Sequence, residues 1–218
     1  MTPYYYEENG ITIYNGDCLE IMKQFEDKSF DLVLTDPPYG IGYKGENRPN
    51  ETKRDVIEND NREINYKSLI IELERLGKDV IIWGANNFSR DLPHNGRWIC
   101  WDKRLSEKAD RMLGSPFELA WSNRETGYYK MYRILHGGAV NADGYGIKRV
   151  HPTQKPIELM RRIIEDYKSN FILDPFMGSG TTLIAAKQLG RKAVGIEIVE
   201  KYCKIAKQRL EATPVLLF

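Results

Sequence analysis

The sequence predicts a doubly wound α/β fold with a mostly parallel sheet, in a single domain that spans residues 1–218. Three observations lead to this prediction: short apolar runs recur along the chain, amphipathic helical patterns fall between several of them, and a glycine-rich turn joins one run to a helical stretch. Alternating strands and helices are typical of a sheet covered by helices. At 218 residues, 41% of them hydrophobic, the chain is long enough to bury one substantial core.

Seven apolar runs have the length and residue types of buried strands. They lie at residues 11–14, 30–34, 80–83, 98–101, 117–121, 171–173 and 193–196. Residues 183–189 are predicted to form a helix after the glycine-rich turn. Two further helical faces are apolar, one with Ile157, Met160, Ile164 and Tyr167, the other with Val199, Tyr202, Cys203, Ala206 and Leu210. We expect both of these helices to pack on the sheet.

Residues 36–39 read Asp-Pro-Pro-Tyr, directly after a predicted strand. The amine of an aromatic ring is a weak nucleophile, and two acceptors aimed at its hydrogens would compensate the charge that develops on nitrogen. The Asp36 carboxylate and the Pro37 carbonyl can supply them, because Pro37 and Pro38 stiffen the backbone and add no N–H donor. Tyr39 offers a flat face for a stacked base. Alone, the motif is also compatible with an ordinary strand-to-turn connection.

The glycine-rich turn occupies residues 174–182, Asp-Pro-Phe-Met-Gly-Ser-Gly-Thr-Thr. Gly178 and Gly180 let the backbone approach a ligand closely, while Thr181 or Thr182 could cap the helix and leave N–H groups for an anion. The turn lacks both the third glycine of a dinucleotide fingerprint and the Gly-Lys-Ser/Thr of a phosphate-binding loop, which disfavours nicotinamide and ATP. A tight turn without a ligand is the alternative.

Glu197 ends the last predicted strand, where a doubly wound sheet places an acid that accepts from ribose hydroxyls. A solvated acid at a strand end would look the same in sequence. The glycine-rich turn and this acid together therefore predict a nucleotide-like cofactor, and neither does so alone.

Together these segments resemble the β-class S-adenosylmethionine-dependent DNA amino-methyltransferases, in which the Asp-Pro-Pro-Tyr motif precedes the Phe-x-Gly-x-Gly motif. The resemblance covers most of the chain, and both motifs are intact. It implies a Rossmann-like methyltransferase fold with circularly permuted motif order. It also implies direct transfer of the methyl group of S-adenosylmethionine to a flipped-out base. Asp-Pro-Pro-Tyr is the version usually found with adenine N6 as the target, and Ser-Pro-Pro-Tyr the version found with cytosine N4.

The resemblance also assigns residues. Asp36, Pro37, Pro38 and Tyr39 would hold the target amine, Glu197 the cofactor ribose, and Asp17 would lie near the cofactor adenine. A His-Pro-x-x-Lys-Pro element of the family occurs at residues 151–156, where it either approaches the cofactor carboxylate or only starts a helix, with Pro156 in its first turn. The residues expected at the cofactor are Asp17, Cys18, Asp36, Thr153, Gln154, Lys155, Asp174, Phe176, Gly178, Ser179, Gly180, Thr181, Thr182, Glu197 and Ile198.

A net charge of +1 gives no general indication of nucleic-acid binding, so a DNA-binding surface must be local. Between residues 97 and 151 ten basic residues are interleaved with aromatic ones and with six acidic residues, which predicts a small target-recognition insertion or a solvated sheet face. Residues 41–63 are almost wholly polar and predict a mobile loop over the DNA. The residues expected to contact DNA are Lys44, Arg48, Lys53, Arg54, Asn86, Lys103 and Arg104.

Composition bounds the remaining possibilities. The three cysteines are scattered, as expected for reduced core residues of a cytoplasmic protein, and the three histidines suggest no zinc site. Nowhere do 18 apolar residues follow one another, so no membrane segment is expected. The expected partner is double-stranded DNA, and a homodimer and a cognate restriction endonuclease are left open.

Other functions fit parts of the pattern. Cytosine N4, an RNA base or a protein glutamine amide could replace adenine N6 as the acceptor. Asp36 in place of Asn, and the motif order, argue against the glutamine amide. A non-catalytic DNA-binding subunit with the same fold is the alternative of a different class, although such subunits typically lose the catalytic acid or the glycine-rich turn.

Overall fold

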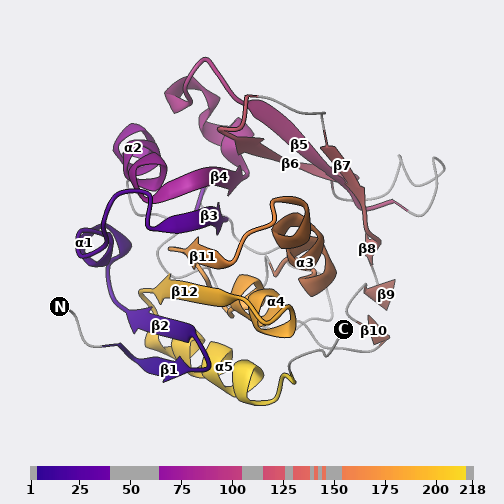
Figure 1. The fold of residues 1–218 in the computed structure, drawn as a ribbon. Coiled ribbons are helices and arrows are strands. Elements are labelled where there is room, and N and C mark those ends of the chain that lie inside the picture. The colour runs from indigo at the N-terminus through magenta and orange to yellow at the C-terminus, as the bar shows by residue number, and fades with distance from the viewer. Residues whose placement is uncertain are drawn as a thin grey trace, which may run out of the picture.

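The computed structural model describes residues 4–39, 64–104, 115–125, 130–137, 140–141, 144–145 and 154–214. Their main feature is a nine-stranded sheet with the order β1-β2-β12-β11-β3-β4-β6-β5-β7 (Figure 1). Its strands are β1 Tyr6–Glu8, β2 Ile11–Asn15, β3 Phe30–Thr35, β4 Gly77–Trp83, β5 Arg97–Asp102, β6 Phe117–Ser122, β7 Lys130–Arg133, β11 Phe171–Asp174 and β12 Lys192–Glu197. A separate three-stranded sheet contains β8 His136–Gly137, β9 Val140–Asn141 and β10 Gly144–Tyr145.

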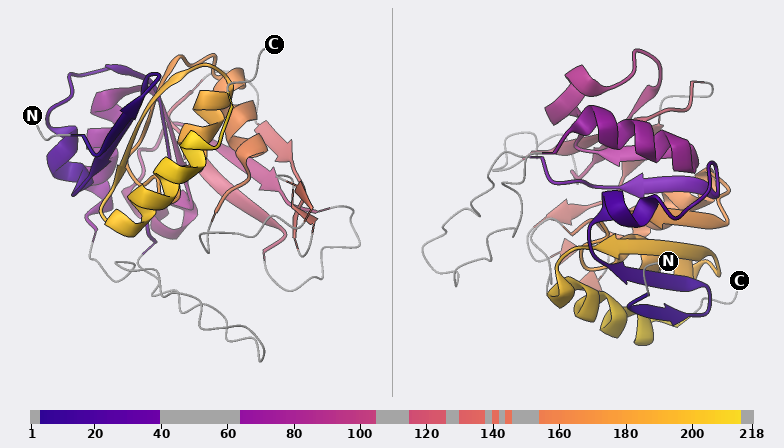
Figure 2. Two further views of the ribbon diagram at one scale, coloured as in Figure 1. Left: turned by 90° about the horizontal axis from the view of Figure 1, so that it is seen from below. Right: turned by 90° about the vertical axis from the view of Figure 1, so that its left-hand side faces the viewer.

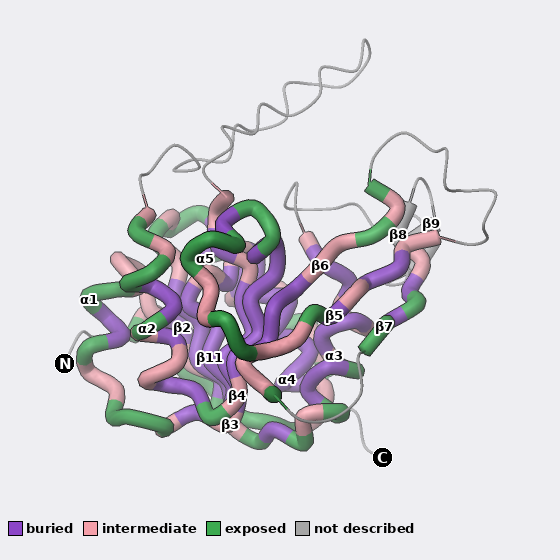
Figure 3. The backbone as a smooth tube through the Cα atoms, turned by 90° about the horizontal axis from the view of Figure 1, so that it is seen from above, coloured by how far each residue is buried: buried purple, intermediate pink, exposed green. Residues whose placement is uncertain are grey.

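Five neighbouring strands, β2, β12, β11, β3 and β4, run parallel, and β6 follows β4 in the antiparallel sense. Strands such as β3 and β11 are apolar along nearly their whole length because they are covered on both faces. The burial colours of Figure 3 show these central strands in the interior. The doubly wound, mostly parallel α/β fold predicted from the sequence is therefore confirmed.

Helices cover both faces of the sheet (Figure 2). They are α1 Cys18–Met22, α2 Tyr66–Leu76, α3 Ile157–Asp166, α4 Thr181–Gln188 and α5 Glu200–Glu211, with the 3₁₀ helix η1 at Ala85–Asp91. Buried side chains of α3, α4 and α5 form one apolar cluster with the sheet, and those of α1 and α2 form a second with its other face. The two clusters anchor the strand ends from which the loops of the site emerge.

The direction of winding reverses between β11 and β3. From β11 the chain passes through α4 to β12 on one side, whereas from β3 it continues through α2 to β4 on the other. Open α/β sheets bind ligands outside the carboxyl ends of their strands at such a reversal. The Asp-Pro-Pro-Tyr segment and the glycine-rich turn both begin at this point.

All seven strands expected from the apolar runs are present, within three residues at their ends. The helix expected at 183–189 begins earlier, at Thr181, because Gly180 rather than Thr181 or Thr182 is the N-cap and no side chain caps it. Of the three cysteines expected to be core residues, Cys203 is fully buried, Cys18 is partly buried against the cluster of α1 and α2, and Cys100 is partly exposed in β5. The strands β1 and β7 and the helices α1, α2 and η1 were not predicted.

Candidate active site

The Asp-Pro-Pro-Tyr segment leaves the carboxyl end of β3, and its acid is held on both oxygens. Oδ1 of Asp36 accepts a short hydrogen bond from the Tyr39 hydroxyl. Oδ2 accepts one from the ammonium group of Lys155, which lies just before α3 and is 7% exposed. Lys155, one of the residues expected at the cofactor, thus directly contacts the expected catalytic acid.

The ring of Tyr39 occupies the space that a side chain at position 84 would need, and position 84 is a glycine. Gly84 follows β4 with φ +68°, and a Cβ built there would lie 2.0 Å from Cε1 of Tyr39. Burial and the nearby Asp36 carboxylate raise the pKa of the Tyr39 phenol, which keeps its proton available for the bond to Asp36. The structure therefore fixes the ring by packing and the hydroxyl by a charge-assisted hydrogen bond.

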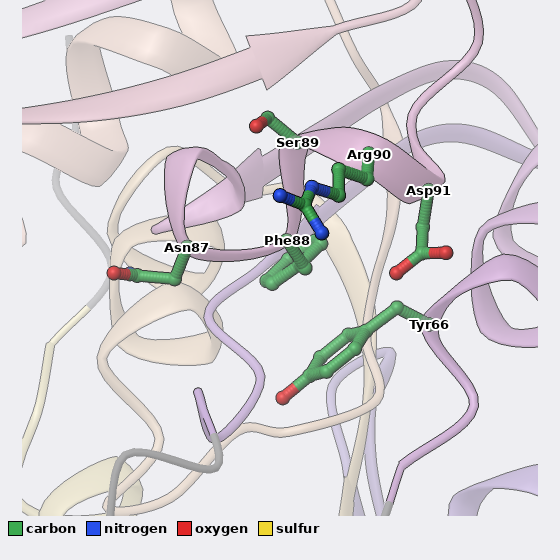
Figure 4. Close-up of a pocket in the computed structure, with 6 residues that line it drawn as sticks. All are labelled: Tyr66, Asn87, Phe88, Ser89, Arg90 and Asp91. Carbon is green, nitrogen blue, oxygen red and sulfur yellow. The ribbon is translucent and has the colours of Figure 1, made fainter.

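A second tyrosine holds the backbone of the same segment. The hydroxyl of Tyr66, the first residue of α2, donates to the Pro38 carbonyl at 2.7 Å. Its ring stacks on Phe88 of η1, with centroids 4.1 Å apart and 5° between the ring planes. Beside this pair lies a hollow of about 470 Å³ (Figure 4), lined by Tyr66, Asn87, Phe88, Ser89, Arg90 and Asp91.

The motif resemblance implies methyl transfer, and we expect Tyr66→Phe to slow that reaction about 3- to 10-fold, the loss of one neutral hydrogen bond, while leaving cofactor affinity unchanged. The ring and its stacking on Phe88 are kept, so only the hydrogen bond to the Pro38 carbonyl is lost. Single-turnover kinetics measures the effect. Tyr132→Phe is the matched control, because its hydroxyl donates to Asp166 at 2.7 Å, away from this segment. Equal rates for Tyr66→Phe and the unmodified protein would contradict the positioning role.

The acid at the end of β11 links the two motifs. Oδ1 of Asp174 accepts hydrogen bonds from the hydroxyl of Thr35 on β3, at 2.9 Å, and from the backbone N–H of Phe176, at 3.2 Å. Burial raises the pKa of Asp174 to about 6, against the opposing effect of these bonds and of the Thr182 hydroxyl. The hydrogen bond from Thr35 ties the strand that carries Asp36 to the strand that carries the glycine-rich turn.

This raised pKa has a consequence for stability. Between about pH 4 and pH 6 the folded chain binds more protons at Asp174 than the unfolded chain does, so this group lowers the free energy of unfolding as the pH rises, by at most about 3 kcal/mol. We expect Asp174→Asn to remove that decrease. Urea unfolding of both proteins at pH 4, 5, 6 and 7 measures it, and parallel curves for the two proteins would contradict the assignment.

The glycine-rich turn is closed by Glu197 at the end of β12. The Glu197 carboxylate accepts from the backbone N–H of Gly178 at 3.1 Å and from that of Val199 at 2.8 Å. Burial raises its pKa, although these N–H groups oppose the effect. Ile198 N–H also bonds to this carboxylate. Its two oxygens together offer four acceptor sites, so capacity for a further donor is left, which suits a carboxylate expected to bind ribose hydroxyls.

The other residues expected at the cofactor lie along the same edge of the sheet. Asp17 caps α1 by accepting from Leu19 N–H at 2.8 Å, and Cys18 begins that helix. Asn15 at the end of β2 donates to the carbonyls of Glu197 and Ile198 at 2.8 and 3.1 Å. The structure therefore brings the ends of β2, β12, β11 and β3 together.

Within the glycine-rich turn not every side chain faces the expected ligand. Ser179 is buried, and its hydroxyl and carbonyl accept from Arg209 of α5 at 3.0 and 2.6 Å. Thr181 and Thr182 are buried in the first turn of α4. Phe176 is partly buried against the α1 and α2 cluster. Gln154 precedes Lys155 and is partly buried, whereas Thr153 lies outside the described residues.

The expected DNA contacts divide into three groups. Lys44, Arg48, Lys53 and Arg54 lie outside the described residues, as does the loop expected at 41–63. Asn86 is exposed in η1. Lys103 forms a short ion pair with Glu118, and Arg104 binds the buried carboxylate of Asp102 at 2.8 Å. The region between residues 97 and 151 contributes β5, β6 and β7 to the main sheet. Its other parts lie partly outside the described residues, namely 105–114, 126–129, 138–139, 142–143 and 146–153.

The sequence indicated that residues 84–88, after β4, line the site or form an ordinary turn, and Gly84 does lie against Tyr39. Two other residues of the site, Tyr66 and Glu118, were not identified from the sequence. Tyr66 lies at the start of a helix without a motif. Glu118 did leave a signal, since it is an acid inside the apolar run of β6. Its side chain pairs with both Lys103 and Lys155, which places it beside Asp36.

Two family models match the sequence. One, described as DNA methylase of the N6/N4 type, matches residues 78–208, more than half of the chain. The other, described as N-6 DNA Methylase, matches residues 5–95, which include the Asp-Pro-Pro-Tyr segment. The chain belongs to the N6/N4 DNA methylase family. Its resemblance to S-adenosylmethionine-dependent DNA methyltransferases, stated above from the motifs, is thereby confirmed.

Curated relatives of this methyltransferase align over nearly its whole length. The type II methyltransferase M2.MboI of Moraxella bovis is 29% identical, with 99% of this chain and 94% of the relative covered. M2.DpnII of Streptococcus pneumoniae is 28% identical, with 97% and 94% covered. Both are named type II methyltransferases.

Solved structures share the fold of the methyltransferase. The M1.HpyAVI–SAM complex matches with a TM-score of 0.59 at 22% identity, over 92% of this chain and 98% of that one. The PvuII DNA methyltransferase, described as cytosine-N4-specific, matches with a TM-score of 0.59 at 15% identity, over 98% and 99%. Within the described residues, no helix is long and apolar enough to cross a membrane.

The cofactor of this methyltransferase is S-adenosylmethionine. The residues at the sheet edge fit it. Gly180 has φ +81°, and a Cβ built there would lie 2.8 Å from the Cβ of Ala206, so the turn stays tight against α5 only with glycine. Glu197 is a partly buried carboxylate with acceptor capacity for hydroxyl groups.

Proposed function

We propose that the methyltransferase transfers a methyl group from S-adenosylmethionine to the N6 amine of a flipped-out adenine in DNA. The observation that carries this proposal is the position of Asp36: it leaves β3 where the winding of the sheet reverses, next to the glycine-rich turn of β11. The match of residues 5–95 to the N-6 DNA Methylase model supports adenine over cytosine.

In this proposal the bound cofactor supplies an electrophilic methyl group on a positively charged sulfur. Glu197 would bind the ribose, and Asp17 would lie at the adenine of the cofactor. The backbone from Phe176 to Gly180 would enclose the methionine part, with Gln154 and Lys155 near its carboxylate. Thr153 is proposed for the same role on the basis of the sequence alone.

Asp36 and the Pro37 carbonyl would accept the two hydrogens of the adenine amine. They would stabilise the positive charge that develops on nitrogen as the N–C bond forms, and the proton would leave afterwards. The Tyr39 ring would stack on the base, and the bond from Tyr66 to Pro38 would keep the segment rigid. No covalent bond to the protein is required.

Incubation with S-adenosylmethionine labelled in the methyl group and with unmethylated duplex DNA tests the proposal. After digestion to nucleosides, chromatography should show the label in N6-methyladenine, and mapping of the modified positions should reveal the recognition sequence. Label in N4-methylcytosine would replace adenine by cytosine as the target, and label in RNA or protein alone would move the substrate out of DNA. No label in any acceptor would indicate a non-catalytic subunit.

Three further properties belong to this proposal. The candidates for DNA contacts are Asn86, Lys103 and Arg104, together with Lys44, Arg48, Lys53 and Arg54.

A homodimer would extend a recognition region that is short for an independent sequence-specific enzyme, and sedimentation of the protein with and without DNA tests this. The names of the type II relatives fit a role beside a restriction endonuclease.

A further inference from the structure

A row of four alternating charges leads from β5 to the catalytic acid. The ammonium of Lys103, directly after β5, pairs with Oε1 of Glu118 on β6. Oε2 of Glu118 lies 3.1 Å from the ammonium of Lys155, which in turn pairs with Asp36. Because two ammonium groups and two carboxylates are present, the row is neutral as a whole.

The two lysines of the row are largely buried. The side chain of Lys155 is only 8% exposed and that of Lys103 16%. Each ammonium lies over an indole ring, Lys155 at 5.7 Å from the centre of Trp83 and Lys103 at 5.0 Å from that of Trp101. The two ammonium groups hold the pKa of Glu118 at about 2 although burial alone would raise it. Glu118 is thus a fixed negative charge between two lysines.

This arrangement bears on the availability of Asp36. Both oxygens of Asp36 already accept hydrogen bonds, one from Tyr39 and one from Lys155. Each oxygen has a second lone pair, so an incoming amine must share one of these oxygens with the donor already bound to it. A buried ammonium cannot leave one carboxylate unless a second stabilises it, and Glu118 supplies that second carboxylate.

We propose that Glu118 is a positioning residue for methyl transfer: it shares the Lys155 ammonium with Asp36 and so keeps an oxygen of Asp36 available to the target amine. The inference rests on the proposed function, because it assumes that Asp36 accepts a base amine. It extends that function to a residue on β6, in a different part of the sheet from both motifs. Among the residues that the structure describes, Lys155 without the Glu118 charge keeps Asp36 as its one carboxylate partner and binds it more tightly.

Glu118→Gln tests the inference, measured on duplex DNA that contains a mapped methylation site. We expect the single-turnover rate of methyl transfer to fall about 10-fold, in the range typical of coupled neighbours, with the Kd for S-adenosylmethionine changed less than about 3-fold. Glu118→Asp keeps the charge and should recover most of the rate. A rate for Glu118→Gln equal to that of the unmodified enzyme would overturn the inference.

Glu158→Gln is a matched control. Glu158 on α3 is as exposed as Glu118, 33% against 31%, and also has two cationic partners, Arg161 at 3.3 Å and Arg162 at 2.7 Å. None of these belongs to the row of four charges, so Glu158→Gln should not change the rate. A similar loss of rate in both variants would show a general effect of charge and would overturn the inference.

A double-mutant cycle separates positioning from simple structural support. In a Lys155→Met background, Glu118→Gln should change the rate less than about 2-fold, because the group through which it acts is gone. A full 10-fold loss in that background would overturn the inference. If the unmodified enzyme methylates no base, the proposed function fails. The inference rests on that function and fails with it, whereas an active unmodified enzyme whose rate does not respond to Glu118→Gln would overturn the inference alone.

Discussion

Asp36→Ala should reduce methyl transfer by about 10²- to 10³-fold or more, the loss typical for removing a preorganised group that stabilises charge in a transition state. Affinity for S-adenosylmethionine should stay within a few fold, because the interaction with the amine is realised mainly as the N–C bond forms. Lys155, which loses Asp36 in this variant, keeps Glu118 as a carboxylate partner. Single-turnover transfer rates and calorimetric titration with the cofactor measure the two effects.

Asp31→Ala is the control for this experiment. Asp31 lies on the same strand at its other end, where its carboxylate accepts from Lys78 at 2.8 Å and from the N–H groups of Asn170 and Phe171 at 3.0 and 3.1 Å. Its loss should lower the free energy of unfolding and leave the transfer rate unchanged. Transfer by Asp36→Ala at the rate of Asp31→Ala would refute the assignment of Asp36.

Gly180→Val should weaken binding of S-adenosylmethionine about 10-fold or more and affect the rate at saturating cofactor much less. The residue has φ +81°, which disfavours any side chain, and a Cβ there would lie 2.8 Å from that of Ala206, so the turn or α5 must shift. The turn relaxes away from α5 in the free variant, and the cofactor must restore the strained conformation at a cost of about 1–3 kcal/mol; each 1.4 kcal/mol corresponds to a factor of ten in affinity. Calorimetry on the folded protein measures the Kd.

The chain offers a control with the same backbone conformation. Gly190, after α4, has φ +64°, but a Cβ built there would meet nothing within 4 Å. Gly190→Val therefore shares the backbone strain and lacks the clash with α5. Equal cofactor affinities for the two variants would contradict a role of the close approach at Gly180 in forming the site.

The sequence predicted those parts of the fold that local patterns determine. Strands β3 and β11 are recognisable because burial on both faces leaves short, nearly continuous apolar runs. The antiparallel direction of β6 and its place between β4 and β5 depend on pairing between distant segments, which no local pattern encodes. Helix α2 was not predicted even though Leu69, Ile70, Leu73 and Leu76 are buried on one face.

In the candidate active site, the motifs predicted which chain segments lie close together. They did not predict the side-chain contacts that residues outside the motifs make with these segments. Asp36, Gly178 and Glu197 lie at neighbouring strand ends, as the motifs imply. The contacts of Tyr66 and Glu118 with this site depend on how α2 and β6 pack against it, so neither residue has a motif of its own.

Gly84 sets a condition for transplanting this chemistry. The tyrosine ring at position 39 fills the volume that any side chain at position 84 would need, although 45 positions separate the two in the chain. The two residues therefore form one structural unit. A designer who grafts the tetrapeptide into another α/β scaffold must also place a glycine at the end of the adjacent strand, because any larger residue there would overlap the aromatic ring.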